Sequence, residues 1–146
     1  MTTPTRTIDV LLVEDDAGDE LITREAFEQN KIANTLHVAR DGQEGLDFLY
    51  RRGEHETAPR PDLVLLDLNL PKYDGRQLLE QIKSDPELCD IPVVVLTTSS
   101  AEEDILRSYK LHANAYVTKP VDLDQFMSAV RQIDEFFVQV VRLPGR

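Results

Sequence analysis

The sequence contains a single cysteine and no long apolar run. One cysteine excludes an intrachain disulfide and a thiolate metal cluster. Cys89 has no adjacent histidine and lacks the positive surroundings of a reactive thiol, so we expect it to be chemically inert. A membrane-spanning helix needs about 20 consecutive apolar residues, and the N-terminus lacks the layout of a secretory signal. We therefore predict a cytoplasmic protein that is not inserted in a membrane.

Positive charge is scarce in this chain. Its 16 lysines and arginines face 27 aspartates and glutamates, for a formal net charge of −11. Nucleic acids and anionic membranes are held largely by basic side chains that neutralise phosphates, so we expect neither as a partner. The excess of acids can serve solubility, or some of the carboxylates can surround a bound cation. Position in the sequence, and not composition, distinguishes these two explanations.

The 146 residues fit one domain with one substantial core. Apolar runs without polar alternation, such as LVLL and VVVL, are typical of strands that are buried on both faces. The expected strands are Ile8–Val13, Thr35–Ala39, Leu63–Leu66, Val93–Leu96 and Ala115–Val117. Helical stripes follow them at Leu21–Phe27, Leu46–Tyr50, Leu78–Ile82, Ile105–Tyr109 and Phe126–Phe137. This alternation predicts an α/β fold with a doubly wound, five-stranded parallel sheet and five helices.

Polar side chains stand where the expected strands end. Glu14 and Asp15 follow the first strand, Asp67 the third, Thr97 the fourth and Lys119 the fifth. With the strand order 2-1-3-4-5 they gather at one rim, where open α/β sheets bind their ligands. Three nearby carboxylates repel one another unless a cation is present, and all-oxygen ligation favours Mg²⁺. A nucleophile, a metal, a cation and a hydroxyl donor are the parts that phosphoryl transfer needs.

Each of these residues also has an ordinary explanation. Asp67 could cap a turn, and the acids after the first strand could cap the next helix. Thr97 could satisfy backbone groups, and Lys119 could lie in an exposed loop. All five polar residues, however, stand at the ends of four strands, and this coincidence favours a shared functional site over five separate structural roles.

Four segments occur in an order that resembles the receiver domains of bacterial two-component systems. They are LLVEDD (Leu11–Asp16), LLDLNLPKYDG (Leu65–Gly75), VLTTSS (Val95–Ser100) and AYVTKP (Ala115–Pro120). The resemblance covers about residues 8–138. It implies a flavodoxin-like receiver fold for a single domain over residues 1–146, with its core at 8–138 and an apolar C-terminal extension at 139–146.

The resemblance also implies how the acids would work. Asp67 would be the phosphoacceptor and a Mg²⁺ ligand, beside Asp15 as a direct ligand. Glu14 would support the metal through water, and Asn69 would contribute its backbone carbonyl. Mg²⁺ is therefore the expected cofactor.

A switch is implied by the same resemblance. Thr97 would contact the phosphoryl group and Lys119 would pair with it. Thr97 would move toward the phosphate while Tyr116 turns inward, which would remodel the face made by the fourth helix, the fifth strand and the fifth helix. The double threonine departs from the usual receiver pattern, in which a small residue follows the switch threonine, so Thr98 and Ser99 are candidates for tuning the phosphorylated state.

A finer resemblance suggests the partners. RPDLVLLDLNLPKYDGRQLL and SYKLHANAYVTKPVDLDQF are similar to segments of response regulators that pair with phytochrome histidine kinases. A phytochrome-type sensor histidine kinase is thus the expected phosphodonor, and output is expected through contacts, since no effector segment follows. Such regulators tend to form homodimers through an apolar C-terminus, here FFVQVVRLPG, and its large side chains are difficult to bury in one domain. The expected homodimer interface includes the face made by the fourth helix, the fifth strand and the fifth helix, together with the C-terminus. The candidate residues at the C-terminus are Phe136, Val138, Val140 and Leu143.

Three other functions fit the sequence less well. A phosphohydrolase of the haloacid dehalogenase type needs a second acid two residues after its nucleophile, where this chain has Asn69. A flavodoxin-like FMN carrier needs a phosphate-binding loop after Val13, and none is there. A degenerate receiver that acts only as a scaffold conflicts with the intact set of acids, threonine and lysine. We therefore expect a signalling protein that catalyses only its own phosphorylation and dephosphorylation.

Overall fold

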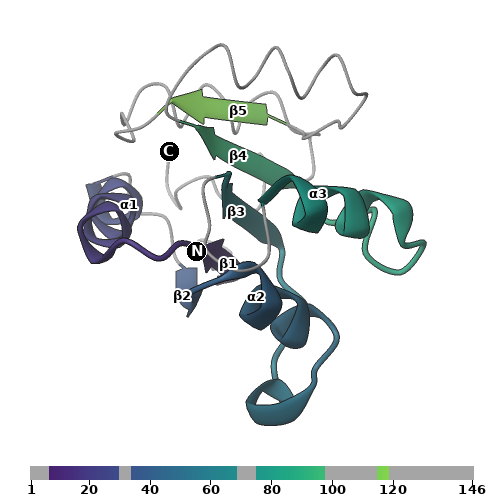
Figure 1. Ribbon diagram of the computed structural model, residues 1–146. Helices are drawn as coiled ribbons and strands as arrows, with labels where there is room; N and C mark the ends of the chain where they lie inside the picture. Colours follow the sequence, from purple (N-terminus) through teal and green to yellow (C-terminus); the bar gives the residue numbers. More distant parts are fainter. Residues whose placement is uncertain (1–6, 30–33, 69–74, 98–114, 119–146) are drawn as a thin grey trace, which may run out of the picture.

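The computed structural model describes residues 7–29, 34–68, 75–97 and 115–118 (Figure 1). In chain order the elements are β1 (Ile8–Val13), α1 (Ala17–Gln29), β2 (Asn34–Ala39), α2 (Gly42–Leu49), the short 3₁₀ helix η1 (Gly53–His55), β3 (Leu63–Asp67), α3 (Gly75–Ser84), β4 (Val93–Thr97) and β5 (Ala115–Thr118). The fourth and fifth helices of the sequence prediction fall outside the described residues.

The strands form one parallel sheet in the order β2-β1-β3-β4-β5, which confirms the predicted topology. Every strand prediction is confirmed within one residue at each end. β2 begins one residue earlier than predicted, at Asn34, and three strands end one residue later: β3 at Asp67, β4 at Thr97 and β5 at Thr118. The polar residues Asp67 and Thr97 therefore belong to the strands themselves.

Two apolar layers cover the two faces of the sheet. Alternate residues of β1 point to opposite faces, as strand geometry requires. Val10 and Leu12 pack with Phe27 of α1 on one face, while Leu11 and Val13 pack with α2 and α3 on the other. Figure 1 shows α1 on one side of the sheet and α2 and α3 on the opposite side. The continuous apolar runs are therefore buried on both faces, as their sequences predict.

Local hydrogen bonds define where α2 begins. Asp41 is its N-cap, and the Asp41 carboxylate accepts a hydrogen bond from the backbone N–H of Glu44 at 2.8 Å. Glu44 reciprocates by accepting from the backbone N–H of Arg40, also at 2.8 Å. Such pairs satisfy N–H groups that have no partner inside the helix. Asp41-Gly42, a pair typical of turns in sequence, thus stands at a helix entrance.

Gly75, the first residue of α3, lies against the end of β3. A Cβ atom on Gly75 would come within 2.6 Å of the backbone oxygen of Asp67 and within 2.7 Å of the Cα of Leu68. Both contacts are with backbone atoms, which cannot turn away as the tip of a flexible side chain can. Only glycine therefore allows α3 to start this close to Asp67.

We expect Gly75→Ala to lower the free energy of unfolding by about 1–3 kcal/mol, because the added methyl group must displace the backbone after β3. Urea unfolding measures the difference. Gly45→Ala is the matched control: its Cβ would meet only side-chain atoms, of Leu78 and Val13, at 3.3 Å. Alanine also favours the helical conformation more than glycine does, so Gly45→Ala should change the free energy of unfolding by no more than about 1 kcal/mol. Equal stability of Gly75→Ala and the wild type would contradict this account.

Candidate functional site

The carboxyl ends of β1, β3 and β4 lie at the same edge of the sheet. Val13 pairs with Leu66, and Asp67 pairs with Leu96. The backbone N–H of Glu14, just beyond β1, donates to the carbonyl of Ala39 at 2.9 Å. The pairing thus extends past the last residue of β1 and holds Glu14 beside the strand ends. This edge is where the general rule for open α/β sheets places a ligand.

An acid cluster, defined as Glu14, Asp15 and Asp67, occupies this edge. One carboxylate oxygen from each residue lies within 4.8 Å of the others. Glu14 and Asp67 are buried, with 0% and 2% of their surface exposed, whereas Asp15 is exposed. Three negative charges this close are unfavourable without a compensating cation. The donor set is all oxygen and has one exposed member, which fits a hard divalent cation such as Mg²⁺ that keeps some of its water ligands.

Asp16, the third acid of the run, has a different role. Its carboxylate accepts a hydrogen bond from the backbone N–H of Gly18 at 2.9 Å, and its carbonyl accepts from Glu20 at 3.0 Å. Its own N–H donates to the Glu14 carboxylate at 3.3 Å. The run therefore divides: Asp16 serves the start of α1, whereas Glu14 and Asp15 face Asp67. The helix-cap explanation therefore applies to Asp16, whereas the positions of Glu14 and Asp15 fit the explanation as ligands.

Thr97 ends β4 next to the strand that carries Asp67. It is fully buried, and its backbone pairs in register with Thr118 of β5. Tyr116 pairs with Val95 in the sheet, and only its backbone placement is described. The remaining predicted site residues fall outside the described ranges: Asn69, Thr98, Ser99, Lys119 and the interface candidates Phe136, Val138, Val140 and Leu143.

A network of charged side chains links the start of α1 to the residue that follows β2. Glu20 binds Arg40 at 2.7 Å and Arg24 at 3.0 Å. Burial tends to raise the pKa of Glu20, but the hydrogen bonds and positive charges of the two arginines outweigh it, so this pKa lies below its ordinary value. Arg40 is thereby held by a carboxylate outside the acid cluster.

Gly75 is the contributor to this edge that the sequence prediction missed. In the sequence, Asp74-Gly75 is only a pair typical of turns, whereas in the structure the missing side chain of Gly75 lets α3 start against the backbone of Asp67. The signal was present in the sequence, but the close approach to β3 depends on tertiary packing.

We expect Asp15→Asn to weaken Mg²⁺ binding at least about tenfold, because one unit charge a few ångströms from a divalent ion is worth more than the roughly 1.4 kcal/mol that this factor requires. The Mg²⁺-dependent rise in melting temperature measures the affinity. Asp16→Asn is the matched control: it removes the same charge from the next residue, and asparagine still caps a helix. Equal weakening in both variants, or none in Asp15→Asn, would contradict a metal site at the acid cluster.

Comparison with known proteins identifies the family. Residues 10–131 match the response regulator receiver domain. The chain is 47% identical to the response regulator Rcp1 of Synechocystis sp. (strain ATCC 27184 / PCC 6803 / Kazusa) over 136 residues, which cover 93% of this chain and 92% of Rcp1. The described helices include none that is long and apolar enough to cross a membrane.

Solved structures agree with the sequence comparison. The Mn²⁺-bound form of Rcp1 has a TM-score of 0.74 at 46% identity, over 94% of this chain and 99% of that one. The phosphorylated cyanobacterial phytochrome response regulator RcpA has a TM-score of 0.76 at 44% identity, over 97% and 100%. The bacteriophytochrome response regulator AtBRR has a TM-score of 0.82 at 45% identity, over 87% and 92%. The chain belongs to the response regulator receiver domain family of two-component signalling.

Proposed function

We propose that Asp67 accepts a phosphoryl group from a sensor histidine kinase in a Mg²⁺-dependent reaction. The observation that carries this proposal is the acid cluster: a buried aspartate at the end of β3 faces two more carboxylates at the edge of a parallel sheet. Membership of the receiver family and the phosphorylated state of the relative RcpA support it.

The chemistry requires little covalent machinery from the protein. A carboxylate oxygen of Asp67 attacks the phosphorus of a phosphohistidine; a P–O bond forms, the P–N bond breaks, and the histidine leaves with the electron pair. Mg²⁺ supplies charge neutralisation for the phosphoryl oxygens and for the crowded acids. Asp15 and Asp67 would hold it directly, with the backbone carbonyl of Asn69, and Glu14 would act through water.

Two further residues complete the proposed site. Thr97 ends the adjacent strand and would donate its hydroxyl to a phosphoryl oxygen. Lys119 follows β5 in the sequence and would pair with another oxygen as a point charge. The protein would in this way catalyse only its own phosphorylation and dephosphorylation and would signal through contacts with other proteins.

We expect a small phosphodonor with Mg²⁺ to add one phosphoryl group to the wild type and none to Asp67→Asn, because an amide oxygen is a poor nucleophile. Intact-protein mass spectrometry measures the uptake. Asp16→Asn, which changes the same charge outside the acid cluster, should be phosphorylated like the wild type. Uptake by Asp67→Asn at the wild-type rate would disprove the assignment of the phosphoacceptor.

The proposed output is a conformational switch. New charge-assisted bonds would draw Thr97 toward the phosphoryl group. Tyr116, on the neighbouring strand, could then rotate into the space that Thr97 leaves. This would change the face formed by the fourth helix, β5 and the fifth helix. Thr98 and Ser99, next in sequence, would tune how long the phosphorylated state lasts.

We expect BeF₃⁻ with Mg²⁺, which imitates an aspartyl phosphate, to shift the nuclear magnetic resonance signals of Thr97 and Tyr116. Asp67→Asn with the same additions is the control and should show neither shift. An unchanged Tyr116 signal in the BeF₃⁻-bound wild type would refute the switch as described.

The proposed phosphodonor is a phytochrome-type histidine kinase. Support comes from two similar proteins, the cyanobacterial phytochrome response regulator RcpA and the bacteriophytochrome response regulator AtBRR. Phosphotransfer from each purified candidate kinase tests this choice, and faster transfer from a kinase without a phytochrome sensor would contradict it.

We further propose that residues 8–138 form one receiver core and that the apolar extension 139–146 contributes to a homodimer. The proposed interface includes Phe136, Val138, Val140 and Leu143, whose apolar surface would otherwise be difficult to bury. Light scattering should show a dimer at micromolar concentration, and Val138→Asp should shift it toward monomer, because an unpaired charge would be buried in the interface. A monomeric wild type under these conditions would count against the dimer.

A further inference from the structure

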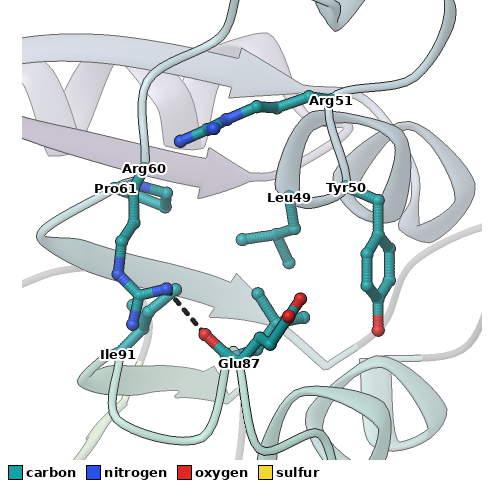
Figure 2. A pocket seen from close by; sticks show the side chains of 8 residues that line it. Leu49, Tyr50, Arg51, Arg60, Pro61, Glu87 and Ile91 are labelled. Carbon is teal, nitrogen blue, oxygen red and sulfur yellow. Dashed lines mark hydrogen bonds between the residues drawn. The ribbon is translucent and has the colours of Figure 1, made fainter.

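A hollow of about 430 Å³ lies at the end of the sheet opposite the acid cluster (Figure 2). Three segments surround it: the end of α2, the residues just before β3, and the segment between α3 and β4. Pro61 and Ile91 precede β3 and β4, whereas Asp67 and Thr97 end these strands. At about 3.3 Å per residue, a strand of five residues separates the two ends by roughly 16 Å. The hollow is therefore distinct from the proposed phosphorylation site.

The hollow combines an apolar interior with a positive rim. Its buried lining residues are all apolar: Leu49, Pro61, Leu88 and Ile91. Arg51 and Arg60 are exposed at its edge, together with one acid, Glu87. Cationic side chains thus outnumber anionic ones here, although the whole chain has a net charge of −11. In Figure 2 both guanidinium groups lie on the Pro61 side, and the Tyr50 ring lies on the opposite side.

The backbone of Arg51 indicates that this side chain is placed for a purpose. Arg51 directly follows the C-cap of α2 and has a φ of 56°, in the left-handed region that favours glycine. Many helices end with a residue in this conformation, but arginine is strained there, whereas glycine is not. Strained residues concentrate at functional sites. Within residues 7–29, 34–68, 75–97 and 115–118, the guanidinium of Arg51 makes no ion pair, whereas neighbouring Arg52 binds Asp47 at 3.2 Å.

The walls of the hollow are held by hydrogen bonds across its segments. Arg60 donates from Nη1 to the carbonyl of Glu87 at 2.6 Å, which joins the β3 side to the α3–β4 segment. Tyr50 donates its hydroxyl to Asp85 and accepts from Gln81 at 3.0 Å. The bond to Asp85, with burial, raises the pKa of Tyr50. These links tie the end of α2 to the end of α3, so the hollow is formed before any ligand arrives.

We propose that this hollow binds a small amphipathic anion, an apolar or aromatic body that carries one carboxylate or phosphate group. Its volume is in the range of small-molecule sites, which are mostly apolar with a few placed polar groups. Guanidinium groups bind carboxylates and phosphates through paired hydrogen bonds. The anionic group meets Arg51 and Arg60, and the body lies over Leu49 toward the Tyr50 ring. Glu87 disfavours a second negative charge.

Phenylbutyrate serves as the probe, with phenylbutylamine and phenylbutanol as matched compounds of the same body. Amide correlation spectra of the full chain should show saturable shifts with phenylbutyrate, confined to residues 49–51, 60 and 87–91. The amine and the alcohol should bind at least about tenfold more weakly. A tenfold change in affinity corresponds to about 1.4 kcal/mol, and a hydrogen bond to a charged group is worth more than that. Equal binding of all three compounds, binding elsewhere, or no saturable binding at millimolar concentration would overturn the proposal.

Arg51→Gly separates the ligand-binding role from a structural one. Glycine adopts a φ of 56° without strain, so the fold is retained, while affinity for phenylbutyrate should fall about tenfold. Arg24→Gln is the control, since it removes the same charge from α1, whose residues do not line the hollow. It should change affinity less than about threefold. Wild-type affinity in Arg51→Gly, or an equal loss in both variants, would overturn the proposal.

The outcome is independent of the phosphorylation chemistry. Asp67→Asn leaves the hollow intact and should bind phenylbutyrate like the wild type. Loss of binding in Asp67→Asn would contradict a separate site.

Discussion

Parallel pairing of β1 with β3 brings like charges together at one edge of the sheet. Because Val13 stands opposite Leu66, the residues that follow these two strands emerge side by side. Glu14 and Asp67 are almost fully buried there, and only Asp15 is exposed. Burying two carboxylates next to a third is unfavourable by itself, so the apolar layers on both faces of the sheet must hold them in place. The same repulsion makes this edge a favourable place for a cation.

The surrounding elements allow this arrangement to form. Gly75 lets α3 start against the backbone of Asp67, where any side chain would collide with β3 and Leu68. Asp16 completes the start of α1 and places its N–H on the Glu14 carboxylate. Glu20 holds Arg40 at the residue that follows β2. Each contact defines the position of one neighbour of the acid cluster, which is how a buried group of charges retains a single geometry.

The two ends of the sheet have opposite character. The carboxyl ends carry the acid cluster, which fits a cation, whereas the amino ends of β3 and β4 border a hollow with Arg51 and Arg60 at its rim. Both strands run from one region to the other, so each contributes to both. Family membership accounts for the first region, since receiver domains of two-component signalling share it. The second follows from the residues of this chain, above all from an arginine in a left-handed conformation.

The sequence by itself determined where the strands lie and which polar residues stand at their ends. Apolar runs such as LVLL are typical of buried parallel strands, and the polar residues that end them converge once the strand order is known. Only the tertiary structure decided which acids converge, because Glu14, Asp15 and Asp16 are equivalent in sequence but point in different directions after β1. The close approach at Gly75 and the hollow beside Arg51 were also decided there. The first depends on how α3 packs back against the end of β3, and the second on segments far apart in the chain, and no local pattern encodes either distance.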